Sequence, residues 1–491
     1  MSLQVYNVLV RKKQEFKPIQ EGQVHMYVCG PTVYDHSHVG HAKLYISMDV
    51  IVRYLRYLGY QVRYVQNITD VGHLLDSGED RIMRGVRRER AAGVSRGGVE
   101  PMELTERYTR LYFEDMDALG VLRPDISPRA SGHIPEQIAL AQTLIEKGHA
   151  YEANGSVYFD VPSWPAYGRL SGRRVEELDA GARVAVLDEK RHPADFALWK
   201  KAEPEHILQW DSPWGRGYPG WHAECTAMAT KYLGQPFDIH GGGLENMFPH
   251  NECEMAQSEA AADGAPFANY WLLAGSLTIE GVKMSKSLGN SVTIPAALER
   301  WRPQVVRAFI LSTHYRSPVD FSGRAVEAAG KGWERINSAA NLVRQQLRTS
   351  PAGGEGGGEF ITFLEGKKAA FLARMNDDFN TPAALGVLHD FTRGVNTLLN
   401  SDNVVSKQTL EAIDQLYREL AGDVLGILAE EAAGSASAER EAGLVELLIE
   451  MRDRARQNKY WAEADRIRGR MKELGIVLQD RPDGTLWRIT G

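Results

Sequence analysis

Three groups of side chains in the sequence have types and spacing that could do chemistry. The first is His38, Gly40 and His41, a His-x-Gly-His pattern at the end of one expected strand and the start of an expected helix. A helix N-terminus offers unpaired N–H groups and a partial positive charge, which suit a phosphate group. Imidazole donors would add to this, and glycine permits close backbone approach. Alone, the pattern is short, and histidines in a surface loop are its commoner explanation.

The second group is Lys283 and Lys286 in the segment GVKMSKSLGN. Two ammonium groups in a Gly/Ser-rich loop could contact a triphosphate, although a solvated basic loop has the same composition. His-x-Gly-His followed by Lys-Met-Ser-Lys-Ser resembles the paired signature of class I aminoacyl-tRNA synthetases, with Val39 where the family has isoleucine. The resemblance implies ATP with Mg²⁺, and attack of an amino-acid carboxylate on the α-phosphate. Carried over by motif, the catalytic and ATP-binding residues are His38, Gly40, His41, Lys283 and Lys286.

The third group contains thiols, an imidazole and a carboxylate. Cys29 ends an expected strand, Cys225 lies in GWHAEC, and His250, Cys253 and Glu254 lie in HNECE. On a helix, residues at i, i+3 and i+4 share a face, so His250 could share one metal ion with Cys253 or with Glu254. No Cys-x-x-Cys spacing is present, and buried free cysteine is common. Spacing alone therefore leaves both a metal site and simple buried thiols open.

The first group requires a strand, a helix and a second strand to position it. Residues 23–29 and 61–67 predict two strands, and apolar residues between Leu44 and Leu58 recur at helical spacing. A strand–helix–strand unit with short joints predicts a parallel sheet, in which ligands bind at the carboxyl ends of the strands. The loop from Cys29 to His41 lies at such an end. Residues 237–240 and 250–262 predict a further strand and helix of the same core.

Other segments predict the remaining organisation of the chain. Residues 71–100 are rich in arginine and glycine, which favours a solvated helix or loop. Strand-like SVYFDV and ADFALW fall within residues 120–205, which are interpreted as an insertion. Residues 325–430 predict long helices interrupted by a Gly-rich loop at 350–360. Residues 451–475 hold eight Lys or Arg against four Asp or Glu, a local charge of +4.

Composition excludes several classes of protein. The 491 residues are 43% hydrophobic and 25% charged, which is typical of a globular protein and not of a disordered one. No apolar run of membrane-spanning length and no secretory signal is recognisable, and the three cysteines cannot form a disulfide framework. A cytoplasmic location is expected. The net charge of −7 gives no sign of a nucleic-acid partner, although a local basic patch could still serve one.

From CGPTVYDHSHVGHAK through NITD, GWHAEC and DIHGGG to the terminal residues 460–488, the chain resembles the cysteinyl-tRNA synthetase family. The resemblance implies a single zinc ion bound by Cys29, Cys225, His250 and Glu254. The family usually has HHENE where this chain has HNECE, so Asn251 and Cys253 depart from the pattern. The cysteine-binding residues implied are Gly30, Thr69 and Trp221. The implied anticodon contacts are Arg456, Trp461, Asp465 and Asp480, for which a surface helix with ion pairs such as Glu463–Arg466 is the alternative.

The expected fold is α/β: a Rossmann-like parallel-sheet catalytic domain with an insertion, then a helical bundle and a small C-terminal domain. The expected segments are residues 1–119 and 206–270 for the catalytic domain, 120–205 for the insertion, 271–325 for the KMSKS-bearing region, 326–435 for the bundle and 436–491 for the anticodon-binding domain. The expected partners are tRNA(Cys), ATP and L-cysteine, without a membrane and with the chain a monomer. Two alternatives remain: a cysteine ligase with an amino-sugar acceptor, and a non-catalytic RNA-binding paralogue. The basic tail argues against the first, and the intact signatures argue against the second.

Overall fold

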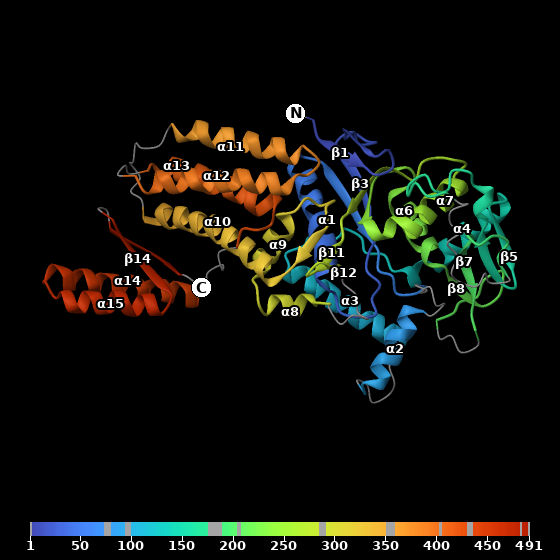
Figure 1. Cartoon of the computed structure of the whole chain (residues 1–491), viewed down its shortest axis with the longest axis horizontal. Coiled ribbons are helices and arrows are strands. Elements are labelled where there is room, and N and C mark those ends of the chain that lie inside the picture. The colour runs from blue at the N-terminus through green and yellow to red at the C-terminus, as the bar shows by residue number, and fades with distance from the viewer. Residues whose placement is uncertain are drawn as a thin grey trace. The chain divides into compact units, whose positions relative to one another are not determined.

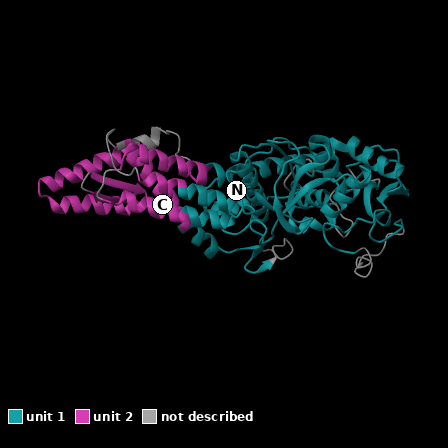
Figure 2. Ribbon diagram, turned by 90° about the horizontal axis from the view of Figure 1, so that it is seen from above, with its two compact units in different colours: residues 1–331, 366–388, 423–427 teal, residues 332–365, 389–422, 428–491 magenta. Residues whose placement is uncertain are grey.

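The computed structural model of the chain describes residues 2–72, 80–93, 100–174, 189–203, 208–283, 291–349, 359–401, 405–429, 436–481 and 484–489 (Figure 1). The chain forms two compact units (Figure 2). Unit 1 comprises residues 1–331, 366–388 and 423–427, and unit 2 comprises residues 332–365, 389–422 and 428–491. Both signature motifs and all the metal-ligand candidates belong to unit 1, whereas the basic tail belongs to unit 2.

A four-stranded parallel sheet forms the centre of unit 1 (Figure 1). Its order is β10-β9-β3-β4, with β3 at Gln23–Val28, β4 at Gln61–Gln66, β9 at Phe237–Gly243 and β10 at Ala268–Ala274. Helix α1 (Val39–Tyr57) joins β3 to β4, which confirms the predicted parallel strand–helix–strand unit. Strand β4 pairs with one edge of β3, and β9 pairs with the other edge. A ligand site is therefore expected at the carboxyl ends of β3 and β9.

A buried ion pair holds α1 against α9 (Pro303–Leu311). Arg307 Nη2 donates to Asp49 Oδ2 at 2.6 Å, and the exposed fractions of the two side chains are 1% and 0%. Arg307 also donates to the backbone carbonyl oxygens of Leu119, Gly120 and Leu425. Because a buried charge is costly unless it is paired and hydrogen-bonded, these contacts fix where four separate segments of unit 1 meet.

Between β4 and β9 the chain adds helices and a second sheet. The helices are α2 (Arg81–Ala91), α3 (Pro101–Ala118), α4 (Ile134–Glu146) and α6 (Trp221–Leu233). The second sheet is antiparallel, in the order β5 (Ala150–Ala153), β6 (Ser156–Phe159), β7 (Phe196–Lys201) and β8 (Gly217–Pro219). The strand-like segments SVYFDV and ADFALW thus contain β6 and most of β7. Their apolar side chains share one core, to which Phe159, Phe196 and Trp199 contribute.

The remaining described elements of unit 1 follow the sheet or precede it. Strands β1 (Gln4–Asn7) and β2 (Lys12–Glu15) form a hairpin, and α7 (Glu252–Ala261) lies between β9 and β10. A small sheet has the order β12 (Val282–Lys283), β11 (Leu277–Ile279) and β13 (Val319–Phe321), and α8 spans Ile294–Leu298. Lys286 lies outside the described residues, and Lys283 is the last one before that gap.

Long helices dominate the second half of the chain, as the sequence predicts. They are α10 (Gly323–Thr349), α11 (Phe360–Met375), α12 (Thr381–Leu399) and α13 (Lys407–Tyr417). The tail of unit 2 consists of α14 (Ala436–Gln457), α15 (Trp461–Glu473) and a hairpin of β14 (Ile476–Arg481) and β15 (Gly484–Ile489). Val445, Met471 and Leu478 lie in the small core of this tail. Among the helices described, none is both long and apolar enough to cross a membrane.

Candidate metal centre and nucleotide site

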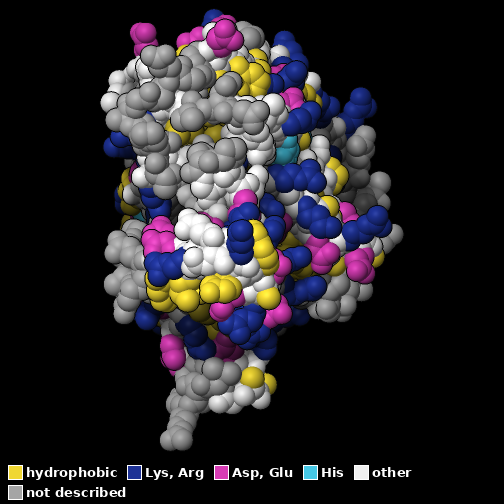
Figure 3. Space-filling model, turned by 90° about the vertical axis from the view of Figure 1, so that its left-hand side faces the viewer, with side chains coloured by type: hydrophobic (Ala, Val, Ile, Leu, Met, Phe, Trp, Pro, Cys, Tyr) yellow, Lys and Arg dark blue, Asp and Glu magenta, His cyan; other side chains and the backbone are white. Residues whose placement is uncertain are grey.

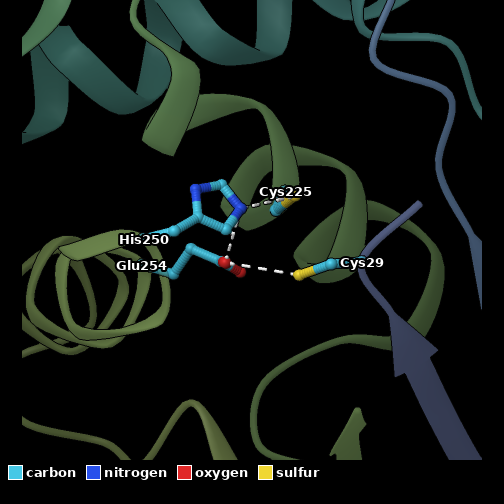
Figure 4. A group of neighbouring side chains, drawn as sticks. All are labelled: Cys29, Cys225, His250 and Glu254. Atoms are coloured by element: carbon cyan, nitrogen blue, oxygen red, sulfur yellow. Dashed lines mark hydrogen bonds and ion pairs between the residues drawn. The ribbon is translucent and has the colours of Figure 1, made fainter. Parts of the chain in front are cut away.

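Four potential metal ligands from three regions of the chain converge in unit 1 (Figure 4). Cys29 directly follows β3, Cys225 lies in the second turn of α6, and His250 and Glu254 lie one turn apart where the chain enters α7. One ligand atom from each residue lies within 4.8 Å of the others, and all four residues are buried. The group sits at the carboxyl end of β3, where the sheet topology predicts a ligand.

The distances within this group are short. His250 Nε2 lies 2.9 Å from Glu254 Oε1, Cys225 Sγ lies 3.5 Å from His250 Nε2, and Cys29 Sγ lies 3.6 Å from Glu254 Oε1. Ligands that surround a zinc ion tetrahedrally at about 2.0–2.3 Å are about 3.3–3.8 Å from one another. The donor set of two thiols, one imidazole and one carboxylate therefore fits one metal ion with small side-chain shifts.

Polar neighbours orient three of the four side chains, those of Cys29, His250 and Glu254. His240 Nε2 lies 2.8 Å from Glu254 Oε2, and His222 Nδ1 lies 3.0 Å from His250 Nδ1. Asn251 Nδ2 donates to Glu254 Oε1 at 3.0 Å and to Cys29 Sγ at 3.6 Å. Such contacts set the direction in which each of these ligand atoms points. Sequence reasoning missed these three neighbours as functional residues, although GWHAEC and DIHGGG contain two of them.

The electrostatics of the group favour a cation. Burial opposes ionisation of Cys225, but its hydrogen bond with Cys29 and the charge of His250 lower its pKa to about 6. The hydrogen bond with Cys225 and burial raise the pKa of Cys29. Burial would lower the pKa of His250, yet Glu254 and Cys225 raise it to about 10, and the histidines lower the pKa of Glu254 despite its burial. At neutral pH the group holds two negative charges and one positive charge, and a bound cation would offset the buried excess.

Cys253 does not belong to this group. Its Sγ lies 3.5 Å from the hydroxyl of Tyr167, in the core beneath the antiparallel sheet, and its side chain is buried. Burial raises the pKa of Cys253, so it remains a thiol. The sequence left open whether Cys253 or Glu254 accompanies His250. In the structure the carboxylate of Glu254 lies in the group, and the thiol of Cys253 points away from it.

Of the three residues implied to bind cysteine, Trp221 contacts the group, Gly30 directly follows Cys29, and Thr69 is linked to Gly30 through Asn67. The ring of Trp221 stacks on His250 with centroids 4.2 Å apart. Gly30 N donates to Asn67 Oδ1 at 2.7 Å, and Asn67 Nδ2 donates to Thr69 Oγ1 at 3.0 Å, so Asn67 links the other two. A Cβ on Gly30 would lie 1.5 Å from the carbonyl oxygen of Asn67, which explains why glycine occupies this position.

The His-x-Gly-His motif begins α1. His38 is the N-cap: its side chain accepts from the backbone N–H of His41, and the His41 side chain accepts from the N–H of His38. Their rings stack with centroids 3.9 Å apart. The segment after Lys-Met-Ser-Lys-Ser runs antiparallel beside the motif, because Val39 N donates to Val292 O and Ile294 N to Ser37 O, both at 3.0 Å. Residues 292–294, which follow the second signature in the sequence, thus lie beside the first signature, whereas Lys286 lies outside the described part of the chain.

The four residues implied to contact the anticodon all lie in the tail of unit 2, on α14, α15 and β14. Asp480 on β14 binds Arg456 at 3.1 Å and Arg452 at 2.5 Å, and Arg452 is buried although its sequence context did not single it out. Trp461 starts α15 with 58% of its surface exposed, and Asp465 follows one turn later. The pair Glu463–Arg466 is present at 3.0 Å. Lys and Arg side chains are spread over the face seen in Figure 3, interspersed with acidic ones.

Comparisons with known protein families cover most of the chain. The tRNA synthetases class I (C) catalytic domain family matches residues 15–331, the DALR domain family matches residues 370–429, and the cysteinyl-tRNA ligase anticodon binding domain family matches residues 443–488. Among solved structures, a Mycobacterium tuberculosis methionyl-tRNA synthetase in complex with methionyl-adenylate matches with a TM-score of 0.60 and 16% identity, over 83% of this chain and 92% of that one. The fold and the paired signatures define a class I aminoacyl-tRNA ligase.

Relatives with high sequence identity show to which family within this class the chain belongs. A cysteine–tRNA ligase from Chlorobaculum tepidum is 50% identical over 499 residues, covering 99% of both chains. The corresponding proteins of Deinococcus radiodurans, with 49% identity over 99% of this chain and 97% of that one, and Thermus thermophilus, with 47% identity over the full length of both, match equally broadly. The chain belongs to the cysteine–tRNA ligase family.

Proposed function

We propose that this chain activates L-cysteine with ATP and transfers it to the 3′ end of tRNA(Cys). The observation that carries the proposal is the buried group of two thiols, an imidazole and a carboxylate beside the His-x-Gly-His helix. The full-length identity to proteins named cysteine–tRNA ligase supports the same substrates. The amino-sugar ligase and the non-catalytic paralogue are the other outcomes that a charging assay distinguishes.

Cys29, Cys225, His250 and Glu254 would hold one zinc ion. Zinc favours thiolate ligands and lowers the pKa of a thiol, so the bound ion supplies selective affinity for the cysteine side chain over that of serine. Trp221 stacks on the ring of His250 and would lie against the bound cysteine. Gly30 and Thr69, joined through Asn67, orient the rest of the amino acid at the end of β3.

ATP would bind at the start of α1. The N-terminal N–H groups of this helix and the imidazoles of His38 and His41 stabilise the negative charge that develops on the α-phosphate, and Gly40 permits close approach. Lys283 and Lys286 contact the triphosphate, which Mg²⁺ accompanies. The cysteine carboxylate attacks the α-phosphate and pyrophosphate leaves. The terminal ribose hydroxyl of the tRNA then attacks the cysteine carbonyl and releases AMP.

The tail would read the anticodon. Trp461 is exposed and suits stacking on an unpaired base, while Arg456 suits a phosphate. Asp480 already binds Arg456, so its role is to hold the guanidinium in place. Asp465, one turn further along α15, would accept from a base. We also propose a cytoplasmic monomer and the segment boundaries at residues 119, 205, 270, 325 and 435.

The test is charging of purified tRNA with labelled cysteine and ATP, with serine as the competing substrate. Charging with cysteine and not serine is the expected result. Cysteine-dependent pyrophosphate exchange without charging would point to another acceptor, as in the amino-sugar ligase. Absence of both activities in folded, metal-loaded protein would favour the non-catalytic paralogue.

A further inference from the structure

Helix α2 presents a basic face to solvent. Its buried positions are Ile82, Gly85, Val86 and Glu89. Arg84, Arg87 and Arg88 lie on another side and are exposed. Residues at i, i+3 and i+4 share one face of a helix, so these three side chains leave α2 on one face, here named the α2 arginine face. From the sequence, this segment is interpreted only as solvated.

The α2 arginine face is fixed to the loop that leads into the nucleotide site. Arg88 Nη1 donates to Asp35 Oδ2 at 2.6 Å, and Arg88 Nη2 donates to the carbonyl oxygen of Tyr34 at 3.0 Å. A Cβ on Gly85 would lie 3.1 Å from that same carbonyl oxygen, so the helix backbone packs directly against the loop. Asp35 precedes His38 by only three residues.

Helix α2 contains little acidic charge to offset its arginines. Glu89 is the only acidic residue of α2, and it is buried and bound to Arg107 and Tyr108. Arg88 is paired with Asp35 and also lies 3.7 Å from Glu89, whereas no ion pair of Arg84 is found among the residues that the structure describes. A chain with a net charge of −7 repels a polyanion unless such local patches attract it.

We propose that the α2 arginine face binds backbone phosphates of the tRNA acceptor arm and so brings its 3′ end to the His-x-Gly-His site. The inference rests on the proposed function, since it assigns a surface to the same RNA substrate. Anticodon contacts in the tail belong to unit 2 and do not themselves position the 3′ end in unit 1. Arg84 and Arg87 contact phosphate, and Arg88 holds α2 on the loop.

The test compares two double variants that each remove two positive charges. R84A/R87A removes the two guanidinium groups assigned to phosphate, and alanine preserves the helix. K17A/R63A is the matched control, because Lys17 precedes β3 and exposed Arg63 lies near the start of β4, at the amino ends of the strands. Binding of fluorescent tRNA(Cys) is measured by anisotropy across KCl concentrations. Separate measurements use RNA hairpins of the acceptor arm and of the anticodon arm.

We expect R84A/R87A to weaken binding of the tRNA and of the acceptor hairpin about tenfold, and to reduce the salt slope by about 1.5–2. Binding of the anticodon hairpin and cysteine-dependent pyrophosphate exchange should stay within about twofold of the unmodified chain. R84E/R87E should lose more affinity for the tRNA and the acceptor hairpin than R84A/R87A does. An acceptor-hairpin affinity and slope equal to those of K17A/R63A would overturn the inference. So would a parallel loss of pyrophosphate exchange, since the helix would then only support the loop. Binding is read without charging, so a failure of the proposed function is seen separately.

Discussion

Zinc binding to the metal-free protein should release about two protons at about pH 7.5. Metal ligands must be deprotonated thiols, neutral imidazole and carboxylate. Cys225, with a pKa of about 6, and Glu254, with a lowered pKa, are already ionised at this pH. Cys29, with a raised pKa, and His250, with a pKa of about 10, each carry a proton that the metal must displace.

The number of protons sets the pH dependence. Each displaced proton changes the apparent affinity tenfold per pH unit, so affinity should rise about 100-fold per unit between about pH 6.5 and 8.5. Toward pH 6 the dependence should steepen, because Cys225 then also becomes protonated. Isothermal titration calorimetry in phosphate and in Tris separates the proton release from the heat of binding, because these buffers differ in their heats of protonation.

Two variants make the result decisive. Cys253→Ser should keep one zinc per chain and the same proton release, because Cys253 faces Tyr167 and not the metal group. Cys29→Ser should weaken zinc binding and change the number of protons released. Release of no protons, or of four, would refute the protonation states assigned to the four ligands. Loss of zinc from the Cys253→Ser variant would refute the ligand set itself.

Three further predictions concern other parts of the chain. Arg307→Met should lower the free energy of unfolding by about 3–5 kcal/mol, because it leaves Asp49 buried with fewer partners; urea unfolding followed by circular dichroism measures this, and a loss below about 1 kcal/mol would contradict it. Trp221→Ala should raise the KM for cysteine about tenfold in pyrophosphate exchange while the KM for ATP stays unchanged, since Trp221 stacks on His250, a proposed metal ligand. Asp480→Asn should increase amide hydrogen exchange in β14 and β15 near neutral pH. Hydrogen bonding to Arg452 lowers the pKa of Asp480 to about 2, so its stabilising effect is present above its usual pKa near 4 and is lost as the pH falls toward 2. The difference between Asp480→Asn and the unmodified chain should therefore vanish near pH 2, and a difference that persists there would count against the ion pair.

Local patterns predicted much of the sheet unit. Alternating residues and a helical repeat indicated β3, α1 and β4 to within a few residues, because their apolar faces follow the periods of strand and helix. The same reasoning indicated the edge of the sheet at which Cys29 lies. It could not choose between Cys253 and Glu254 beside His250, because i+3 and i+4 lie on nearly the same helix face. The tertiary contacts decide between them, because Glu254 lies 2.9 Å from His250 whereas Cys253 lies 3.5 Å from the hydroxyl of Tyr167.

The surroundings of the metal group depended on contacts between distant segments. His240 is 14 residues from Glu254, and His222 is 28 residues from His250, so neither spacing predicts a contact. The sequence did not indicate the buried position of Arg452, for a different reason. Arg452 lies in a basic stretch typical of a solvated surface, yet the structure buries it against Asp480. Composition reports the charge of a segment and not which of its side chains turns inward.

The make-up of unit 1 has a consequence for dissecting the protein into fragments. Residues 366–388 and 423–427 belong to this unit, although the catalytic-domain family match ends at residue 331. Asp378 accepts from Tyr6 N and from the Tyr315 hydroxyl, and Leu425 O accepts from Arg307. A gene fragment that stops at residue 331 would lack both Asp378 and Leu425. The buried guanidinium of Arg307 would then lose one of its hydrogen-bond acceptors. The catalytic half is therefore not a detachable module, and swapping it between relatives requires exchanging three separate stretches of sequence together.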